Sequence, residues 1–258
     1  MLVVDQLCFQ RSEKQILNQI SFRVDEGQLV VIIGQNGSGK SSLLRCLSGW
    51  NRPSDGSIRL LDRSLQSLST KERAAWISFL PQRPNLSESI PILDIVAAAR
   101  YRFSESPSQS RKIAAEYLKK NRIFHLQDRD WHTLSGGEAQ RVALTCMRIQ
   151  GAKIWLLDEP ANHLDPAVQR EMYRDLVQAW LEGKTEIVVT HNINLVLAAV
   201  PPSKYSLVQI IGLHEGAMSF SLPLSDPDIP KRIGTLYNLP IQKVTVFDRE
   251  QFIFGTPQ

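Results

Sequence analysis

One glycine-rich segment constrains this chain more than any other feature. Residues 34–41 read GQNGSGKS and match the pattern GxxxxGK[ST]. The apolar run LVVII at 29–33 precedes the segment as a buried strand would, and the residues after it suit a helix. A strand, a glycine loop and a helix in this order predict an α/β fold that binds the phosphates of a nucleoside triphosphate together with Mg²⁺.

The residue types in this loop explain how it would bind a triphosphate. Glycines let the backbone turn sharply and direct successive N–H groups toward one anion, and the following helix adds the positive end of its dipole. We expect Lys40 to reach the β- and γ-phosphates and the Ser41 hydroxyl to ligate Mg²⁺. The predicted nucleotide-binding residues are Gly34, Gln35, Asn36, Gly37, Ser38, Gly39, Lys40, Ser41 and Ser42.

The composition is that of an ordinary globular protein. Of 258 residues, 43% are hydrophobic and 22% are charged. No apolar run approaches the roughly 20 residues that cross a bilayer, and the N-terminus suits a first strand rather than a signal peptide, so we expect a cytoplasmic protein. The net charge of +4 suits a solvated surface or contact with anionic lipid headgroups, and we predict no nucleic-acid partner.

Hydrophobic patterning predicts a single domain over residues 1–219 with a mostly parallel sheet, because strands and helices alternate. Strands are expected within 1–33 and at 57–61, 76–80, 154–158 and 186–190. Helices are expected at 41–48, after the capping box at 69–72, and from Pro166 to the residue before Gly183.

The character of the chain changes twice. From about residue 83 to 150 it is mostly helical, with helices expected at 92–101 and 111–120 and a polar linker at 104–110. We interpret this span as a helical subdomain inserted into the α/β core. Residues 220–258 follow a proline-rich link as a small C-terminal extension, with strands expected at 241–247 and 251–254.

Two carboxylates follow the apolar strand at 154–158. Ligands of open α/β sheets bind at the carboxyl ends of the strands, where Asp158 and Glu159 lie in the sequence. We expect Asp158 to hold Mg²⁺ directly or through water, and Glu159 to orient or deprotonate an attacking water. A solvated strand end would be the simpler interpretation without the phosphate loop.

Residues 134–141 read LSGGEAQR. Ser135 suits a helix N-cap, and a helix N-terminus binds anions. This segment resembles the signature motif of the ATP-binding cassette (ABC) family, and the resemblance extends from about residue 2 to residue 216. It implies a P-loop NTPase of the RecA-like kind, with a mostly parallel core, an antiparallel β subdomain and an inserted helical subdomain. It also implies ATP as the nucleotide and ATP hydrolysis as the activity.

The resemblance implies further roles at matching positions. Gln82 resembles the glutamine that touches Mg²⁺, and His191 resembles the switch histidine that contacts the γ-phosphate, so the implied catalytic residues are Glu159, His191 and Gln82. The implied metal environment is Ser41, Gln82 and Asp158. Because the chain has one copy of each motif, the family pattern implies a homodimer in which Ser135, Gly136, Gly137 and Glu138 act on the ATP of the partner. The segment 161–165 resembles the loop that crosses that interface.

One position departs from the family pattern, which usually stacks adenine on an aromatic residue after the first strand. The register of Ile16 and Leu17 places Arg11 at this position, with Phe9 two residues earlier. A guanidinium also stacks on a base, so Arg11 or Phe9 is the candidate adenine contact and base selectivity stays open.

The segment 91–101 (PILDIVAAARY) and the sequence HNINL at 191–195 resemble ATPases that serve iron-siderophore, haem and cobalamin importers. This resemblance implies a peripheral subunit on the cytoplasmic face of the cell membrane, bound to a polytopic permease and served indirectly by a substrate-binding protein. We expect the segment after Gln82 to form a groove for a permease helix, with Leu86, Ile90 and Ile92 as apolar contacts.

Other functions of the same family remain as alternatives. A DNA-repair cassette needs a longer insertion than residues 83–133, and a ribosomal cassette has two copies per chain. An ABC exporter ATPase, or a soluble assembly ATPase of the iron–sulfur cluster type, fits the length equally well.

Overall fold

The computed structural model describes residues 1–82, 89–246 and 249–256. Its main sheet has six strands in the order β10-β9-β3-β8-β7-β6. All neighbours are parallel except β10, which pairs antiparallel with β9. The strands are β3 (Leu29–Gly34), β6 (Ile77–Leu80), β7 (Ile154–Asp158), β8 (Thr185–Val189), β9 (Val208–His214) and β10 (Ala217–Pro223). The predicted mostly parallel core is confirmed.

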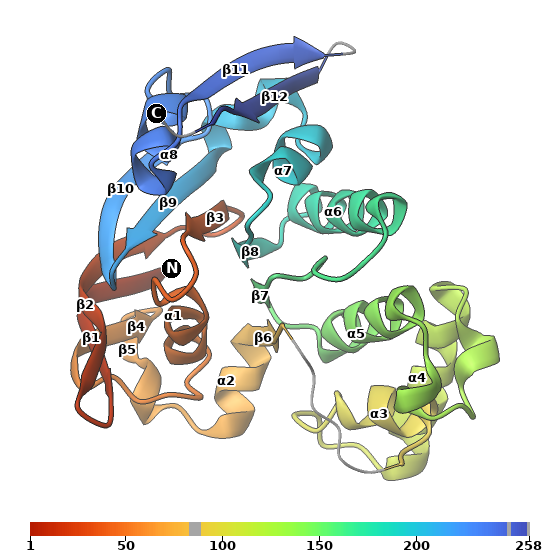
Figure 1. Cartoon of the computed structure of the whole chain (residues 1–258). Coiled ribbons are helices and arrows are strands. Elements are labelled where there is room, and N and C mark those ends of the chain that lie inside the picture. The colour runs from red at the N-terminus through yellow and green to blue at the C-terminus, as the bar shows by residue number, and fades with distance from the viewer. Residues whose placement is uncertain (83–88, 247–248, 257–258) are drawn as a thin grey trace.

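A second sheet is antiparallel, with the order β2-β1-β4-β5. Its strands are β1 (Leu2–Arg11), β2 (Lys14–Val24), β4 (Asp55–Leu60) and β5 (Arg63–Ser64). Figure 1 shows these strands beside α1 (Lys40–Leu47), away from the green helices. The antiparallel β part implied by the family resemblance is present.

Alternate residues of the buried strands point to two separate cores. Val31 and Val188 pack in a cluster with α6 (Pro166–Leu181) and α7 (Ile193–Ala199) on one face of the sheet. Val30 and Ile187 immediately precede Val31 and Val188 in the sequence. They pack in a cluster with α1 and the antiparallel sheet on the other face. Strands buried on both faces are apolar throughout, which is why these runs show no polar alternation in the sequence.

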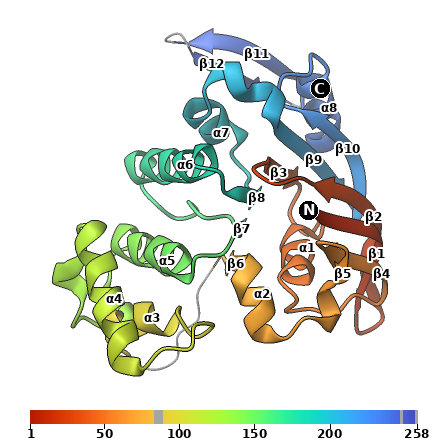
Figure 2. The same ribbon diagram turned by 180° about the vertical axis from the view of Figure 1, so that it is seen from behind.

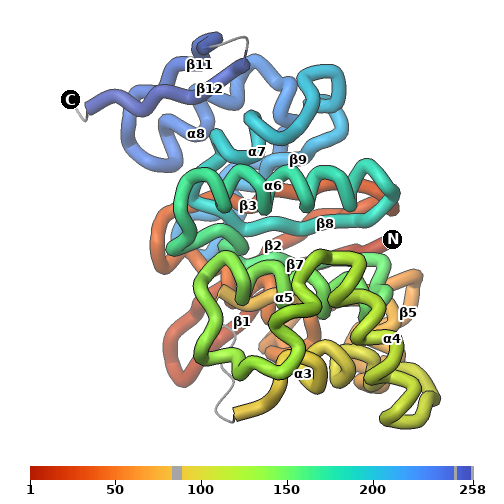
Figure 3. Tube along the Cα trace, turned by 90° about the vertical axis from the view of Figure 1, so that its right-hand side faces the viewer, coloured from red at the N-terminus to blue at the C-terminus, as the bar shows by residue number. Residues whose placement is uncertain are grey.

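The helical part has its own core. It contains α3 (Ile92–Ala98), α4 (Pro107–Lys120), α5 (Gly136–Gln150) and two short 3-10 turns, η2 (Phe124–Leu126) and η3 (Trp131–Thr133). In α5, Val142 and Ile149 face this core while Leu144 and Met147 face the sheet, so one helix belongs to both. Figure 3 shows the helical part at the opposite end of the molecule from the C-terminal hairpin.

Several expected boundaries are wrong by a few residues. Helix α4 begins at Pro107 rather than at residue 111. The Ser106 hydroxyl caps it by accepting a hydrogen bond from the backbone N–H of Gln109, and proline suits the first turn of a helix. The expected linker at 104–110 therefore ends at residue 106. Helix α3 ends at Ala98 rather than residue 101. The capping box of α2 (Thr70–Trp76), with Ser69 and Glu72, is confirmed.

The C-terminal residues are joined to the core rather than set apart from it. Residue 219 lies inside β10, and α8 (Ile229–Tyr237) buries Ile229, Ile233 and Leu236 in the cluster on the α6 face. The hairpin of β11 (Ile241–Val246) and β12 (Arg249–Phe254) lies against α7, as Figures 1 and 2 show. There the Asn194 amide donates to the Phe252 carbonyl at 2.9 Å and accepts from the Phe252 N–H at 2.8 Å.

The remaining short elements connect these layers. They are the 3-10 turns η1 (Leu65–Ser67) and η4 (Pro202–Leu207). The cysteines Cys8, Cys46 and Cys146 are free.

Candidate functional site

The phosphate loop lies between β3 and α1. Gly39 is the N-cap of α1 with φ of 99°, a left-handed conformation that suits glycine. A Cβ added there would lie 2.7 Å from a Leu17 methyl carbon and 2.9 Å from the Ile16 carbonyl oxygen. The sequence needs glycine at this position because any side chain would both strain the backbone and collide with β2.

Lys40 is held inside the loop that it would serve. Its ammonium donates to the carbonyl oxygens of Gly34 at 2.8 Å and Gln35 at 2.9 Å. The residue is 5% exposed, and its burial lowers the pKa of Lys40, while the carboxylates of Glu159 and Asp158 oppose the shift. An ammonium has three donors, so these two bonds leave one for a phosphate oxygen.

Ser41 and Asp158 meet at the end of β7. The Ser41 hydroxyl donates to Asp158 Oδ1 at 3.1 Å. Burial raises the pKa of Asp158, and the bond from Ser41 opposes that rise. Hydroxyl and carboxylate oxygens are hard donors of the kind that Mg²⁺ uses together with substrate phosphates. No group of three or more acidic, histidine or cysteine side chains that could hold a metal occurs among the described residues.

The other two predicted catalytic residues, Gln82 and His191, both contact the Glu159 carboxylate. Gln82 Nε2 donates to Glu159 Oε2 at 2.8 Å, and Asn162 Nδ2 donates to the same oxygen at 2.9 Å. His191 Nε2 lies in direct polar contact with Glu159 Oε1. The Glu159 side chain is 9% exposed while that of His191 is 43% exposed. Three loops, far apart in the sequence, therefore meet at one carboxylate.

The backbone at Glu159 is unusual. Its φ is +50°, in the left-handed region that few non-glycine residues adopt. Its N–H donates to the Val189 carbonyl at 3.0 Å, which ties the carboxylate to the end of β8. A strained residue at a strand end is typical of sites whose geometry is set by function.

A cavity of about 670 Å³ connects these groups. Its described lining comprises Lys14, Ile16, Asn36, Gly37, Gly39, Lys40, Ser41, Ser42, Gln82, Glu159, Asn162, His163 and His191. The phosphate loop and the predicted catalytic residues thus face one space. Asp158 lies behind it, against Ser41.

The two candidate adenine contacts do not line this cavity. Arg11 is exposed at the end of β1, opposite Lys14 in the hairpin, and Phe9 packs against the core cluster under the antiparallel sheet. Lys14 and Ile16 line the cavity instead, and the sequence analysis did not single them out for this role. An adenine contact by Arg11 or Phe9 stays a prediction.

The signature segment lies apart from the cavity. Ser135 is the N-cap of α5, as its sequence predicted, and the structure adds a capping box with Glu138. Neither Ser135, Gly136 nor Gly137 is among the described residues that line the cavity of the phosphate loop. Within one chain, the structure does not bring the two motifs together, which leaves the predicted role in trans as an expectation.

Three hydrogen bonds that support the phosphate loop were not predicted from the sequence. The Gly34 N–H donates to the Tyr237 hydroxyl at 3.1 Å, and the Gln35 amide donates to the Leu236 carbonyl at 3.2 Å. The Gly216 N–H, in the turn between β9 and β10, donates to the Ser38 carbonyl at 3.2 Å. These partners lie some 200 residues apart in the sequence, so no local pattern predicts the contacts and only the fold shows them.

The expected permease groove is only partly described. Leu86 lies outside the described residues, and Ile90 is half-buried. Ile92 was expected to contact a partner but is fully buried in the core of the helical part. It shares one face of α3 with Val96, four residues on, and that face packs inward. No described helix has the length and apolar character needed to span a membrane.

Comparison with known proteins places this geometry in context. A family model described as "ABC transporter" matches residues 17–162. A hemin import ATP-binding protein of Bordetella avium is 34% identical over 203 residues, which cover 75% of this chain and 78% of that protein. A petrobactin import ATP-binding protein of Bacillus anthracis is 31% identical over 199 residues, with 75% and 73% covered.

Solved structures agree with these relatives. A structure described as a metal-chelate type ABC transporter in an inward-facing conformation superposes with a TM-score of 0.78 at 26% identity, covering 98% of this chain and 96% of that one. A dimeric ATP-binding cassette in a post-hydrolysis state with ADP and Pi superposes with a TM-score of 0.75 at 26% identity, covering 88% and 100%.

Proposed function

We propose that this chain, which belongs to the ABC transporter family and is an ATP-binding cassette ATPase, powers import of a metal chelate across the cell membrane. The cargo class is that of the hemin and petrobactin import relatives, which matches the iron-siderophore, haem or cobalamin class that the sequence at 91–101 implies. In this proposal the chain is a peripheral subunit on the cytoplasmic face, bound to a polytopic permease that a substrate-binding protein supplies.

One observation carries the catalytic part of the proposal. Gln82, Asn162 and His191 all contact Glu159, beside the cavity that the phosphate loop lines. Phosphoryl transfer needs positioned charge more than covalent chemistry. Glu159 holds or deprotonates the attacking water, and His191 stabilises the charge near the γ-phosphate, because both side chains reach the same space.

The remaining residues of the site bind the nucleotide. Lys40 and the loop amides hold the β- and γ-phosphates, and the Ser41 hydroxyl, Asp158 and Gln82 form the environment of Mg²⁺. The metal, when bound, neutralises charge on the phosphate oxygens. The signature residues Ser135 to Glu138 complete the site of a second copy of the chain, which makes the working unit a homodimer with two ATP sites.

The experiment that tests this function uses the Glu159→Gln chain. Loss of the carboxylate should lower the ATP turnover number by about 10²- to 10⁴-fold, the range for a general base, while ATP binding persists and locks the dimer. The matched control is Glu116→Gln, the same change on the exposed side of α4. Turnover in Glu159→Gln equal to that of the control would refute Glu159 as the key carboxylate.

The same variant tests the transport role. Tagged Glu159→Gln chain is used with ATP to capture partners from detergent-solubilised membranes, followed by mass spectrometry. A polytopic membrane protein in stoichiometric yield supports the importer. A soluble partner, or no partner with the chain absent from membranes, would overturn it and favour an assembly ATPase of the iron–sulfur cluster type. A permease whose cargo leaves the cell would favour the exporter alternative.

A further inference from the structure

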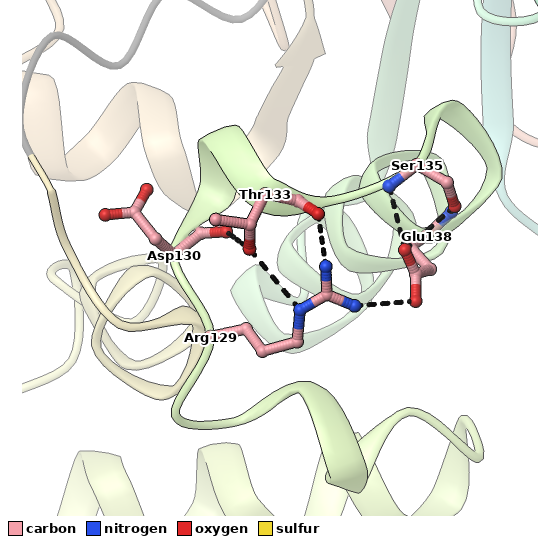
Figure 4. Close-up of polar contacts among 5 residues, drawn as sticks. All are labelled: Arg129, Asp130, Thr133, Ser135 and Glu138. Atoms are coloured by element: carbon pink, nitrogen blue, oxygen red, sulfur yellow. Dashed lines mark hydrogen bonds and ion pairs between the residues drawn. The ribbon is translucent and has the colours of Figure 1, made fainter.

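Arg129 makes a dense set of contacts just ahead of the signature segment. It lies between η2 and η3, where its Nε donates to Thr133 Oγ1 at 3.3 Å and its Nη2 donates to the Thr133 carbonyl oxygen. Its Nη1 donates to Glu138 Oε1 at 3.1 Å in an ion pair (Figure 4). The planar guanidinium has donors in a fixed fork, so one side chain sets the distance between the loop and α5.

Glu138, which Arg129 contacts, is also hydrogen-bonded to Ser135. Its second oxygen, Oε2, accepts from both the Ser135 N–H and the Ser135 hydroxyl, each at 2.8 Å. Figure 4 shows the Glu138 carboxylate between Arg129 and Ser135, in contact with each. One carboxylate oxygen therefore faces the arginine and the other faces the serine. A change at Arg129 would free the carboxylate to rotate and would loosen the serine that it holds.

The backbone of the same segment reaches the start of α3. The Arg129 carbonyl accepts from the Ile92 N–H at 3.0 Å, and Asp130 forms an isolated β-bridge with Pro91. The Asp130 carboxylate also accepts from the Ser89 hydroxyl. Residues 89–92 include Ile90, which we expect to contact a permease. Arg129 thus touches the signature turn with its side chain and α3 with its main chain.

We propose that Arg129 is a positioning residue that holds the Ser135–Glu138 turn in the geometry needed to receive the ATP bound by the second copy of the chain. The inference rests on the proposed function, since the signature turn acts only in the dimer. Arg129 does not line the cavity of its own phosphate loop, so its removal leaves nucleotide binding by one chain intact and weakens only the closed dimer.

The test places Arg129→Gln and Arg129→Lys in the Glu159→Gln chain and measures the ATP-dependent monomer–dimer equilibrium by analytical ultracentrifugation. Affinity for a fluorescent ATP analogue is measured at chain concentrations where the protein is monomeric, and the thermal midpoint is recorded. Lys112→Gln, an exposed cation on α4, is the control in the same subdomain. Arg129→Gln should weaken the dimer by at least about tenfold, the effect of one charge-assisted hydrogen bond.

The expected pattern separates positioning from folding. Analogue affinity and thermal midpoint should match the control, and Arg129→Lys should fall between Arg129→Gln and the parent, because lysine retains the charge but not the fork. A dimer equilibrium unchanged in Arg129→Gln overturns the inference. Loss of nucleotide binding and thermal stability in both variants also overturns it, by showing a folding role. A Glu159→Gln parent that stays monomeric with ATP refutes the proposed dimeric function itself, and the inference with it.

Discussion

Glu186 is a carboxylic acid buried inside the main sheet. It lies in β8 with 0% exposure, and neither of its carboxylate oxygens has a hydrogen-bond partner within the described residues. Its register partner on β7 is Trp155, whose indole N–H is also unpaired there. Burial raises the pKa of Glu186 well above 4.5, and the positive charges of Lys184 and Arg148 only partly oppose this. Burial therefore favours the protonated form of Glu186 in the folded chain.

The consequence for stability has a definite sign. In the unfolded chain this carboxyl ionises near pH 4.5, so between that pH and the raised folded pKa the folded chain keeps a proton that the unfolded chain releases. The free energy of unfolding then falls by about 1.4 kcal/mol for each unit of rising pH. Below pH 4.5 both states are protonated and the penalty disappears. Glutamine has nearly the same shape and does not titrate.

We therefore predict that Glu186→Gln is more stable than the parent chain by a margin that grows with pH. The difference in free energy of unfolding should increase as the pH rises from 5 to 7, by at most about 1.4 kcal/mol per pH unit. Urea unfolding at pH 5, 6 and 7 measures it. Asp158, whose pKa burial also raises, is present in both chains and cancels in the difference.

The control and the refuting result are clear. Glu116→Gln makes the same substitution at an exposed position of α4 and should show no trend with pH. A difference for Glu186→Gln that stays constant from pH 5 to pH 7, or that shrinks as pH rises, would show that Glu186 is ionised in the folded chain and would refute the reasoning.

Three further changes test other parts of the structure. Lys40→Met removes the ammonium held by the loop carbonyls and should weaken ATP binding by about 100-fold, the loss of about 2.7 kcal/mol of charge-assisted bonding; fluorescent-nucleotide titration with unchanged affinity would contradict this. Leu118→Ala opens a cavity in the fully buried core of the helical part and should cost about 2–5 kcal/mol in urea unfolding, whereas a loss below about 1 kcal/mol would show that the helices collapse around it. Gly212→Ala sets a Cβ 2.3 Å from the Phe220 ring and should cost about 1–3 kcal/mol, and an unchanged unfolding midpoint would mean that the ring moves freely.

Features with local causes were predictable from the sequence. They are the strand before the phosphate loop, the capping box at Ser69, the N-cap at Ser135 and the buried strand ending at Asp158. The same local reasoning misplaced the start of α4, because Ser106 and Pro107 suit a helix start as well as a linker. It placed Ile92 at a surface, because an apolar residue looks the same whether it faces a partner or a core.

The candidate site shows the same division. The motifs name the residues around Glu159, and the fold brings Gln82 and His191 to it. Their catalytic roles stay predictions until Glu159→Gln is measured. Arg129 was missed because its partners lie across a turn rather than within a known pattern. Tyr237 was missed because its contact with the phosphate loop depends on how β9, β10 and α8 return to β3.

The contact between Tyr237 and Gly34 also affects how the protein is made. The phosphate loop leaves the ribosome early, yet one of its supports is synthesised about 200 residues later. At a synthesis rate of about 5–20 residues per second, roughly 10–40 s separate the two. During this interval the loop lacks both the Tyr237 hydroxyl and the Leu236 carbonyl that hold its first two residues. A nascent chain therefore presents its phosphate loop without these two hydrogen bonds until α8 has been synthesised and has docked.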